Sequence, residues 1–236
     1  MPSIAYFIGI IVIGSSHKTD GDSFNFDVEK VLGNGFVVNP DKGIILTCEH
    51  VLPKEDRCSG SEFAFFVYDS NMNLKAFIID PNSAVQWAQN DVIALKIINP
   101  IGLNSFPINE SEIHLAIQVI TVGIPLNHFS SRAGENVVTP RALVSNVVSC
   151  YQDECEIDKP FIITMSGSPV LIGETIIGIA TMNREYAINQ YLTERIEQSI
   201  DGRPISKEIY QYDEVARFGV FSKASSWKKW LDDLYV

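Results

Sequence analysis

The sequence predicts an all-β protein, either a sandwich or a barrel. Short runs rich in β-branched and aromatic residues recur along most of the chain, as β-strands favour. Turn residues separate these runs at intervals of about ten positions, the spacing typical of sandwiches and barrels. The chain has 236 residues and is 46% hydrophobic, so it can form one large core or two smaller cores that share an interface.

The expected strands follow one another in chain order. The apolar stretch 4–16 suits a first buried strand, because about ten apolar residues are too few to span a membrane. A signal peptide is the alternative for this stretch, although no Lys or Arg precedes it. The turn sequences NPDKG and SNMN each predict a hairpin. The later strands are expected at 31–38, 43–51, 62–69, 74–80, 91–98, 116–124, 142–151, 161–164 and 168–182, the last being a hairpin around Gly173.

Two stretches break the strand pattern. In 184–200, apolar residues recur at helical spacing, which predicts a helical insertion between two late strands. A loop over 201–214 is expected after it. In 225–235, two tryptophans and two leucines recur at i, i+3, i+4 and i+7, which predicts a C-terminal helix that docks on the β-structure.

The charge balance argues against nucleic acid as a partner. The chain has 18 Lys and Arg against 29 Asp and Glu, a net charge of −11, so a polyanion would be repelled. Basic peptide segments are compatible with an acidic surface, and no membrane association is expected.

Four cysteines are too few for a disulfide-dense scaffold of this length. Cys150 and Cys155 could form a bridge or half of a metal site, but no second pair of ligands follows at finger spacing. We therefore expect no metal and no cofactor. We also expect reduced thiols in a cytoplasmic protein, with secretion as the alternative if 4–16 is a signal peptide.

Three residues far apart in the sequence carry the groups that acyl transfer needs. His50 follows the apolar run IILT, Asp91 opens the strand DVIALKI, and Ser166 lies in the turn Ser-Gly-Ser-Pro. A serine hydroxyl is a poor nucleophile unless a base lies within hydrogen-bond reach. His50 would accept the proton of Ser166 and later deliver it to the leaving amine, while Asp91 would hold the other ring N–H. Spacing alone does not show that these three side chains meet.

Several segments resemble the chymotrypsin-like serine proteases, and in pattern the bacterial HtrA-type and glutamyl-endopeptidase-type peptidases. GNGFVVNPDKGIILTCEHVL (33–52) resembles the first barrel of that family, where a G-x-G-F strand leads into L-T-x-x-H-V. The remaining matches are DVIALK (91–96) with the aspartate strand, VGIP (122–125) with the bend that opens the second barrel, SGSP (166–169) with the nucleophile turn, IIGIATMN (176–183) with the strand that lines the primary specificity pocket, and 218–231 with the last strand and closing helix.

The resemblance implies a fold and a site. It implies one peptidase domain over 1–236, with two six-stranded antiparallel β-barrels over about 1–105 and 112–223 and a helix over 225–235. The helical insertion near 184–200 would interrupt the second barrel. By implication the site lies in the cleft between the barrels, with the residues in these roles: His50, Asp91 and Ser166 catalytic; Thr164 and Ser166 in the oxyanion hole; Gly178, Ile179, Ala180, Thr181 and Pro160 binding substrate.

The chain departs from the family pattern just before Ser166. Family members often have glycine at the position of Thr164, and a β-branched residue resists positive φ. Thr164 is therefore expected either to be strained or to turn its peptide away from the oxyanion hole, and losing one donor there costs about 10²–10³ in turnover. Met165 replaces the aspartate that captures a freed N-terminus in zymogen-type relatives, so activation by N-terminal cleavage is not expected.

Two functions follow from these patterns. The first is a serine endopeptidase that cleaves a protein or peptide substrate in limited, regulatory proteolysis, with a protein partner as a candidate regulator of its activity. Pro160 stands where an acidic residue would mark preference for Arg or Lys, so an uncharged or small P1 residue is favoured, although Asp158 lies nearby. The second is a catalytically silent protease fold that serves as a binding module, an alternative that Thr164 motivates.

Overall fold

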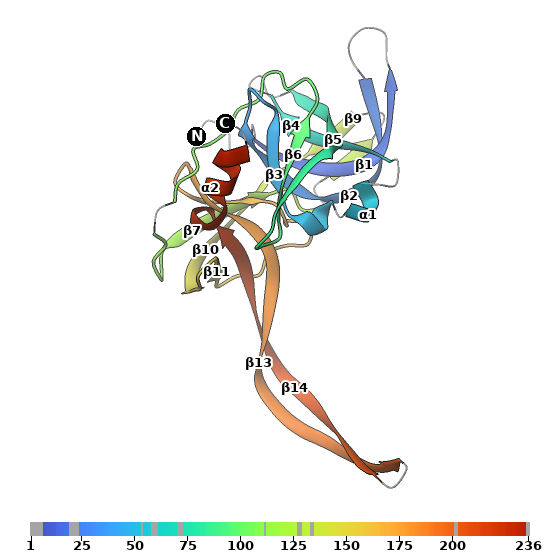
Figure 1. Cartoon of the computed structure of the whole chain (residues 1–236), viewed down its shortest axis with the longest axis vertical. Helices are drawn as coiled ribbons and strands as arrows, with labels where there is room; N and C mark the ends of the chain where they lie inside the picture. Colours follow the sequence, from blue (N-terminus) through green and yellow to red (C-terminus); the bar gives the residue numbers. More distant parts are fainter. Residues whose placement is uncertain are drawn as a thin grey trace.

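Two six-stranded β-barrels and one C-terminal helix make up the body of the protein (Figure 1). The structure is a computed structural model, and it describes residues 7–18, 24–52, 54–57, 61–69, 73–110, 112–126, 129–132, 135–200 and 203–234. The prediction of an all-β fold with two antiparallel barrels is confirmed.

The first barrel closes in the strand order β1-β2-β3-β6-β5-β4, with β1 paired to both β2 and β4. A short 3-10 turn, η2 (Glu49–Val51), and one turn of helix, α1 (Lys54–Arg57), follow β3. The strands are β1 (Ile8–Lys18), β2 (Phe24–Asn39), β3 (Ile44–Thr47), β4 (Glu62–Tyr68), β5 (Leu74–Trp87) and β6 (Val92–Ile97).

The second barrel closes in the order β10-β11-β14-β13-β12-β7, and β8 with β9 forms a separate two-stranded sheet. The strands are β7 (Gln118–Gly123), β8 (Phe129–Arg132), β9 (Glu135–Val138), β10 (Arg141–Cys150), β11 (Glu154–Ile157), β12 (Pro169–Ile172), β13 (Thr175–Ile200) and β14 (Arg203–Lys223).

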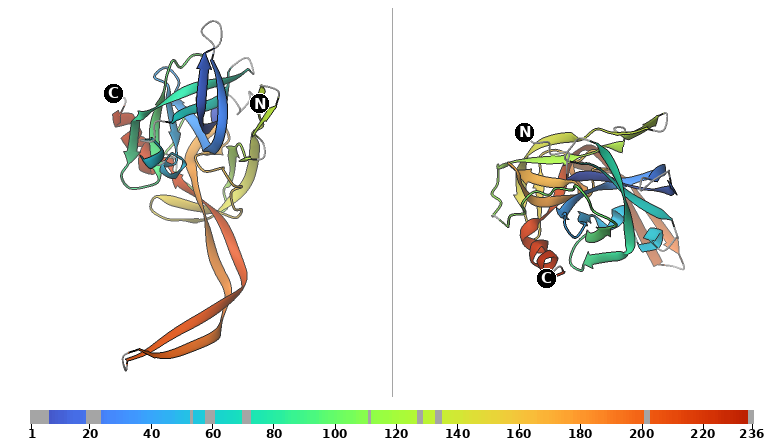
Figure 2. Two further views of the ribbon diagram at one scale, coloured as in Figure 1. Left: turned by 90° about the vertical axis from the view of Figure 1, so that its right-hand side faces the viewer. Right: turned by 90° about the horizontal axis from the view of Figure 1, so that it is seen from above.

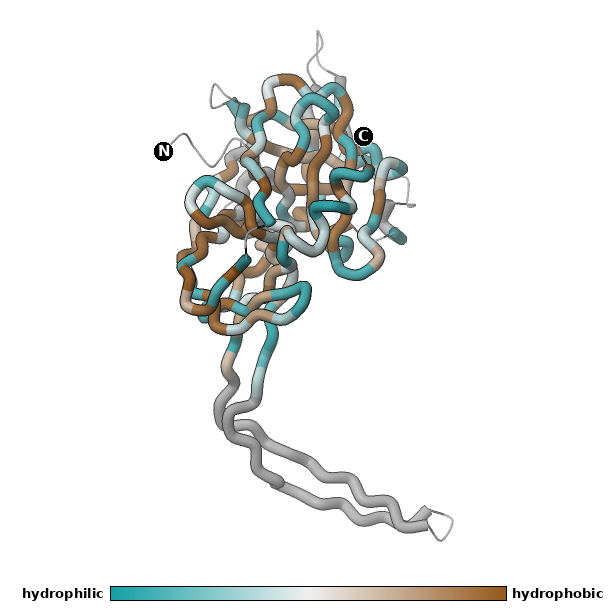
Figure 3. The backbone as a smooth tube through the Cα atoms, turned by 60° about the vertical axis from the view of Figure 1, so that its left-hand side comes forward, coloured by the Kyte–Doolittle hydropathy of each residue, from teal (hydrophilic) through white to brown (hydrophobic). Residues whose placement is uncertain are grey.

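Aliphatic and aromatic side chains fill the barrels, and the apolar stretches of the chain concentrate in their strands (Figure 3). Every residue of β3 is buried, which is why this strand reads as an unbroken apolar run rather than an alternating one. The C-terminal helix, α2 (Ala224–Leu234), packs on the body through Ala224, Trp227 and Leu231, as the sequence predicts. None of the helices in the described ranges has the length and apolar composition that a bilayer span requires.

The predicted helix over 184–200 is wrong. This stretch is the outer part of β13, which pairs with β14 from Gly178↔Lys223 to Ile200↔Arg203 and runs away from the barrels as a long two-stranded arm (Figures 1 and 2). The loop expected over 201–214 is likewise strand from Arg203 onward. Apolar residues four apart lie on one side of a helix but also on one face of a strand, so their spacing did not separate the two. The pairing that begins inside the barrel decides for the strand.

Two further expectations differ from the structure. The segment 161–164, expected as a strand, is the turn that leads to Ser166, closed by a hydrogen bond from Met165 N–H to Ile162 C=O at 3.0 Å. The sulfurs of Cys150 and Cys155 are bonded at 2.09 Å, because these residues face each other across β10 and β11; the expectation of free thiols at this pair is wrong.

Candidate active site

The position of His50 follows from the end of β3. After the buried strand, the chain turns through η2, with hydrogen bonds from Val51 N–H to Cys48 C=O and from Leu52 N–H to Glu49 C=O, both 3.1 Å. Val51 enters the core, while the side chain of His50 stays 49% exposed. A strand end fixed by core packing therefore presents the imidazole at the surface.

Asp91 lies opposite His50 because β3 pairs with β6, with Thr47 facing Ile93. One carboxylate oxygen of Asp91, Oδ1, accepts the backbone N–H of His50 at 3.0 Å. The other, Oδ2, bonds the ring nitrogen Nδ1. Two contacts from one carboxylate fix both the backbone and the ring of His50, which leaves Nε2 as the ring nitrogen free to exchange a proton.

Ser166 sits on a tight turn between the second barrel's strands. Gly167 has φ of +85°, and its N–H donates to Ala180 C=O at 2.9 Å, while Ser168 N–H donates to Met165 C=O at 3.0 Å. The hydroxyl of Ser166 donates to the backbone C=O of Thr181 at 3.2 Å. A glycine is required at 167, because a Cβ there would lie closer than 3.0 Å to Asn34 O and Thr47 Oγ1.

The segments that carry His50 and Ser166 converge on shared atoms. The carbonyl of Ala180 accepts both the N–H of Gly167 and the thiol of Cys48, the latter at 3.1 Å. The backbone N–H of Asn34, in the first barrel, donates to Ser166 C=O at 2.9 Å. The segment that carries His50 and the turn that carries Ser166 therefore lie close together. The hydroxyl points to Thr181 in this conformation, and hydrogen bonds of this kind are often rearranged before substrate binds.

Thr164 adopts the strained conformation, one of the two outcomes expected from its sequence. Its φ is +72°, a left-handed value that costs a non-glycine residue about 1–2 kcal/mol. The backbone N–H groups of Thr164 and Ser166 have no backbone acceptor among the described residues.

The residues expected to bind substrate occupy different positions. Gly178 faces Phe221 and Ser222 of β14, and the side chains of Ile179 and Ala180 are fully buried in the barrel. Thr181 is buried, but its carbonyl reaches Ser166. Pro160 is exposed. Only the carbonyl of Thr181 therefore contacts the candidate nucleophile directly.

Two asparagines were missed by the sequence analysis. The carboxamide of Asn183 bonds both backbone groups of Phe161, at 2.6 Å to the N–H and 3.0 Å to the C=O, and so ties the segment before Ser166 to β13. Asn34 bonds residues of the second barrel. An asparagine in a strand carries no local signal for such contacts, because its partners lie far away in the sequence.

A metal is not favoured by the group Cys48, His50 and Asp91, whose possible ligand atoms lie within 4.8 Å of one another. The thiol of Cys48 is fully buried, and burial raises its pKa well above the usual value, with the charge of Asp91 acting in the same direction. A metal ligand must be the thiolate, and both oxygens of Asp91 are already bonded to His50. This donor set suits a neutral thiol beside a hydrogen-bonded pair.

Two acidic residues that precede Ser166 in the sequence, Glu156 and Asp158, are engaged in structural contacts. Asp158 is exposed and accepts hydrogen bonds from the backbone and side chain of Asn146, at 2.9 and 2.7 Å, which lower its pKa. Glu156 bonds Arg184 at 2.7 Å and Tyr186 at 2.6 Å. The hydrogen bond that the Tyr186 hydroxyl donates to Glu156 raises the pKa of Tyr186.

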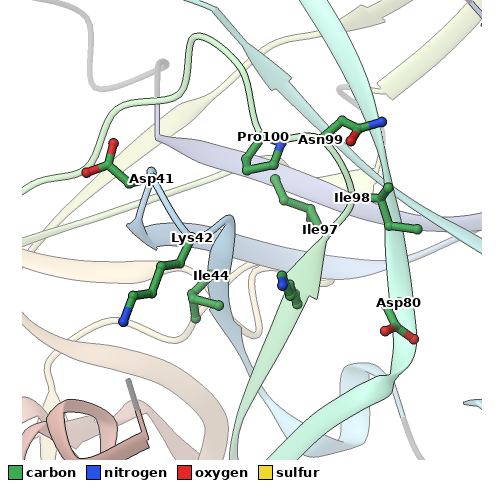
Figure 4. Close-up of a pocket in the computed structure, with 9 residues that line it drawn as sticks. Asp41, Lys42, Ile44, Asp80, Ile97, Ile98, Asn99 and Pro100 are labelled. Carbon is green, nitrogen blue, oxygen red and sulfur yellow. The ribbon is translucent and has the colours of Figure 1, made fainter. Parts of the chain in front are cut away.

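A hollow of about 640 Å³ lies apart from these residues, on the first barrel. Figure 4 shows Asp41 and Lys42 on one side of it, Ile97 and Pro100 between, and Asp80 on the other side. It contains none of the candidate site residues. Its walls carry both charge signs, and its lining provides no base and nucleophile pair.

Comparisons with known proteins identify the fold and the family of the chain. Two solved structures share the fold: mouse brain neuropsin, described as a serine protease, with a TM-score of 0.64, 10% identity and coverage of 100% of this chain and 97% of that one; and a mutant of human heparin binding protein, with a TM-score of 0.61, 13% identity and coverage of 99% and 93%. No curated protein matches. The family model of the trypsin-like peptidase domain matches residues 33–179, more than half of the chain, and the chain therefore belongs to the trypsin-like peptidase family.

Proposed function

We propose that the protein is a serine endopeptidase in which Ser166 is the nucleophile, His50 the general base and acid, and Asp91 the residue that orients His50. The observation that carries this proposal is the double contact of Asp91 with the N–H and Nδ1 of His50. That contact serves an imidazole that takes up and releases a proton at Nε2, a role a purely structural histidine does not need.

The reaction divides into two acyl transfers. Ser166 Oγ attacks the carbonyl carbon of the scissile peptide while its proton passes to His50 Nε2, and the carbonyl oxygen becomes an oxyanion at the N–H groups of Thr164 and Ser166. The C–N bond then breaks as His50 returns the proton to the amine. Water attacks the acyl-enzyme in the same way and releases the acid and the free serine.

The present contacts define what must change first. The hydroxyl of Ser166 donates to Thr181 C=O and must rotate toward His50 before attack. The rotation exchanges one hydrogen bond for another. A substrate strand that approaches β13 would compete for the carbonyl of Thr181. This competition would favour the rotation of the Ser166 hydroxyl toward His50.

A fluorophosphonate probe tests the proposal directly. Wild-type protein is expected to become covalently labelled, and Ser166→Ala and His50→Ala are expected to abolish labelling. Ser168→Ala is the matched control from the same turn, because Ser168 is fully buried and its hydroxyl has no partner in the described part of the chain. If wild type is never labelled, or if Ser166→Ala is labelled equally well, the protein is the silent binding module instead.

The substrate is proposed to be a protein or peptide with an uncharged or small P1 residue. Both carboxylate oxygens of Asp158, the acid nearest to Pro160 in the sequence, accept hydrogen bonds from Asn146, so this carboxylate is engaged with β10. The Asn183 carboxamide occupies space between Phe161 and β13. Cleavage of a peptide set that varies only at P1 should therefore favour Ala and Ser over Arg, Lys and Phe.

The arm formed by β13 and β14 supports limited proteolysis under the control of a protein partner. A two-stranded ribbon is marginally stable by itself, and its outer edges can pair with another strand. Over 184–200 and 203–218, no described strand other than the partner in the arm pairs with either edge.

The HtrA-type or glutamyl-endopeptidase-type subtype and a cytoplasmic location remain predictions. Alkylation of the native protein, with and without reductant, would report the state of Cys150 and Cys155.

A further inference from the structure

Asn34 is a polar side chain with no exposure, and it lies where the two barrels meet. It belongs to β2, yet its carboxamide pairs with the backbone of Ile124, which follows β7. The N–H of Ile124 donates to Oδ1 at 2.7 Å, and Nδ2 donates to Ile124 C=O at 3.1 Å. A buried amide that is fully bonded in this way holds one orientation, because breaking the pair would leave unsatisfied polar groups.

The same amide also bonds the segment that leads to Ser166. Nδ2 of Asn34 donates to Thr164 C=O as well. The backbone of Asn34 adds to this contact, since its N–H donates to Ser166 C=O at 2.9 Å and its C=O accepts the hydroxyl of Thr47 at 2.6 Å. One residue of the first barrel therefore bonds the carbonyl groups of both neighbours of Met165, Thr164 and Ser166.

The conformation of Thr164 needs such support. With its carbonyl fixed, the direction of its N–H is set by φ, which is +72°. Relaxation to the favoured negative region would rotate the 163–164 peptide by roughly 130° or more and redirect its N–H. The hydroxyl of Thr164 offers little resistance, because its contact with Ile163 C=O at 2.5 Å is local and its contact with Ile124 C=O is long at 3.5 Å.

We propose that Asn34 is a positioning residue that holds Thr164 in its left-handed conformation and so keeps the Thr164 N–H directed at the oxyanion of the reaction. This inference rests on the proposed function for its catalytic meaning, while its structural core is the coupling between Asn34 and Thr164. Asn34 touches neither substrate nor the reacting atoms. It acts through Thr164, and it does so from the opposite barrel.

A double-mutant cycle between Asn34→Ala and Thr164→Gly tests the inference. Glycine adopts positive φ without cost, so the conformation should no longer need Asn34. We expect Asn34→Ala to lower the fluorophosphonate labelling rate by about 10²-fold with Thr164 present. It should lower the rate by a much smaller factor with Gly at 164. Asn34→Asp should behave like Asn34→Ala, because a carboxylate can accept from Ile124 N–H but cannot donate to Thr164 C=O.

Tyr68→Phe is the matched control for a lost contact between distant segments. The Tyr68 hydroxyl donates to Val138 C=O at 2.7 Å, across 70 residues and away from Ser166. Tyr68→Phe should shift the unfolding midpoint and leave the fluorophosphonate labelling rate unchanged. If Tyr68→Phe slows labelling as much as Asn34→Ala does, the effect is general loosening and the inference is overturned.

The denaturant midpoints of the four proteins of the cycle provide a readout that needs no activity. These proteins are wild type, Asn34→Ala, Thr164→Gly and the double variant. If Asn34 holds Thr164, the midpoint shifts of the two substitutions are non-additive, with Asn34→Ala less harmful beside Gly at 164. Additive shifts together with equal rate losses in both backgrounds overturn the inference. If wild type does not label but the midpoints are non-additive, the proposed function fails while the holding role of Asn34 stands.

Discussion

Replacement of Gly167 by alanine should be among the most damaging small substitutions in the protein. Gly167 has φ of +85°, and a Cβ at this position would lie closer than 3.0 Å to Asn34 O and Thr47 Oγ1. Gly173 offers a matched control, because its φ is +59° and no atom lies within 4 Å of an added Cβ. Both substitutions force alanine into a left-handed conformation, but only Gly167→Ala also forces it into backbone atoms.

The expected magnitudes follow from these two environments. Left-handed alanine costs about 1–2 kcal/mol, and the reduced entropy of the unfolded chain returns about 0.4–1 kcal/mol, so Gly173→Ala should cost about 1 kcal/mol. The overlap at Gly167 adds about 1–3 kcal/mol, for a total of about 2–4 kcal/mol. For a chain of this size, each kcal/mol lowers the Tm by about 2–4 °C.

Thermal unfolding followed by circular dichroism measures the difference. Both alanines should be placed in a Ser166→Ala background, which removes the proposed nucleophile and with it any self-cleavage. We expect Gly173→Ala to lower the Tm by about 2 °C and Gly167→Ala by about 10 °C. Equal shifts for the two variants would mean that the close approach of the Ser166 turn to the first barrel is absent in solution.

Three further predictions concern other parts of the protein. At pH values below the usual thiol pKa of about 8.5, Cys48→Ala should be less stable than wild type. The difference in unfolding free energy between the two proteins should narrow as the pH rises above that value. Burial raises the folded-state pKa of Cys48, so its stabilising contribution is lost with increasing pH; denaturant melts between pH 7.5 and 10.5 test this, and a constant gap contradicts it. Arg184→Met should lower the free energy of unfolding by about 1–2 kcal/mol, because it leaves the carboxylate of Glu156, which is only 5% exposed, without its cationic partner. Arg217→Met breaks an exposed ion pair and should cost less than about 0.5 kcal/mol. Equal losses in urea melts would refute the distinction. Replacement of 187–215 by a short glycine turn should leave fluorophosphonate labelling of Ser166 unchanged. It should slow the cleavage of a folded protein substrate more than that of a short peptide. Loss of labelling would show that the arm is needed to form the site.

Local patterns carried most of the fold prediction. The buried run of β3, the hairpin signals and the helical spacing of Trp227 and Leu231 each depend on neighbours in sequence, and each is present in the structure. The 184–200 stretch failed for a specific reason, since its spacing fits both periods and only pairing with β14 resolves it. The strand predicted over 161–164 is wrong because its apolar, β-branched residues fit a buried strand, yet Ile162 and Ile163 are 47% and 79% exposed.

The candidate site was less accessible to sequence reasoning than the fold. The motifs indicated the three reactive groups, but they did not indicate that Ser166 would donate to Thr181 or that Asn34 would be buried. The partners of Asn34 lie 90 and 130 residues away, and no periodicity encodes contacts at that range. Thr164 was recognised as a departure from the family pattern, but the contact that accommodates it depends on the opposite barrel.

The Ser166 turn belongs to the second barrel by connectivity but to the first barrel by contact. Asn34 bonds Ser166 C=O, Thr47 closes the space around Gly167, and Cys48 shares the carbonyl of Ala180 with the Gly167 N–H. The turn is therefore completed only when the barrels dock, although each barrel closes its own hydrogen-bonded ladder. It follows that a substitution at the barrel interface can disable the site while both sheets persist, so activity should be lost before β-structure as denaturant is added. A site built within one barrel would lose both together.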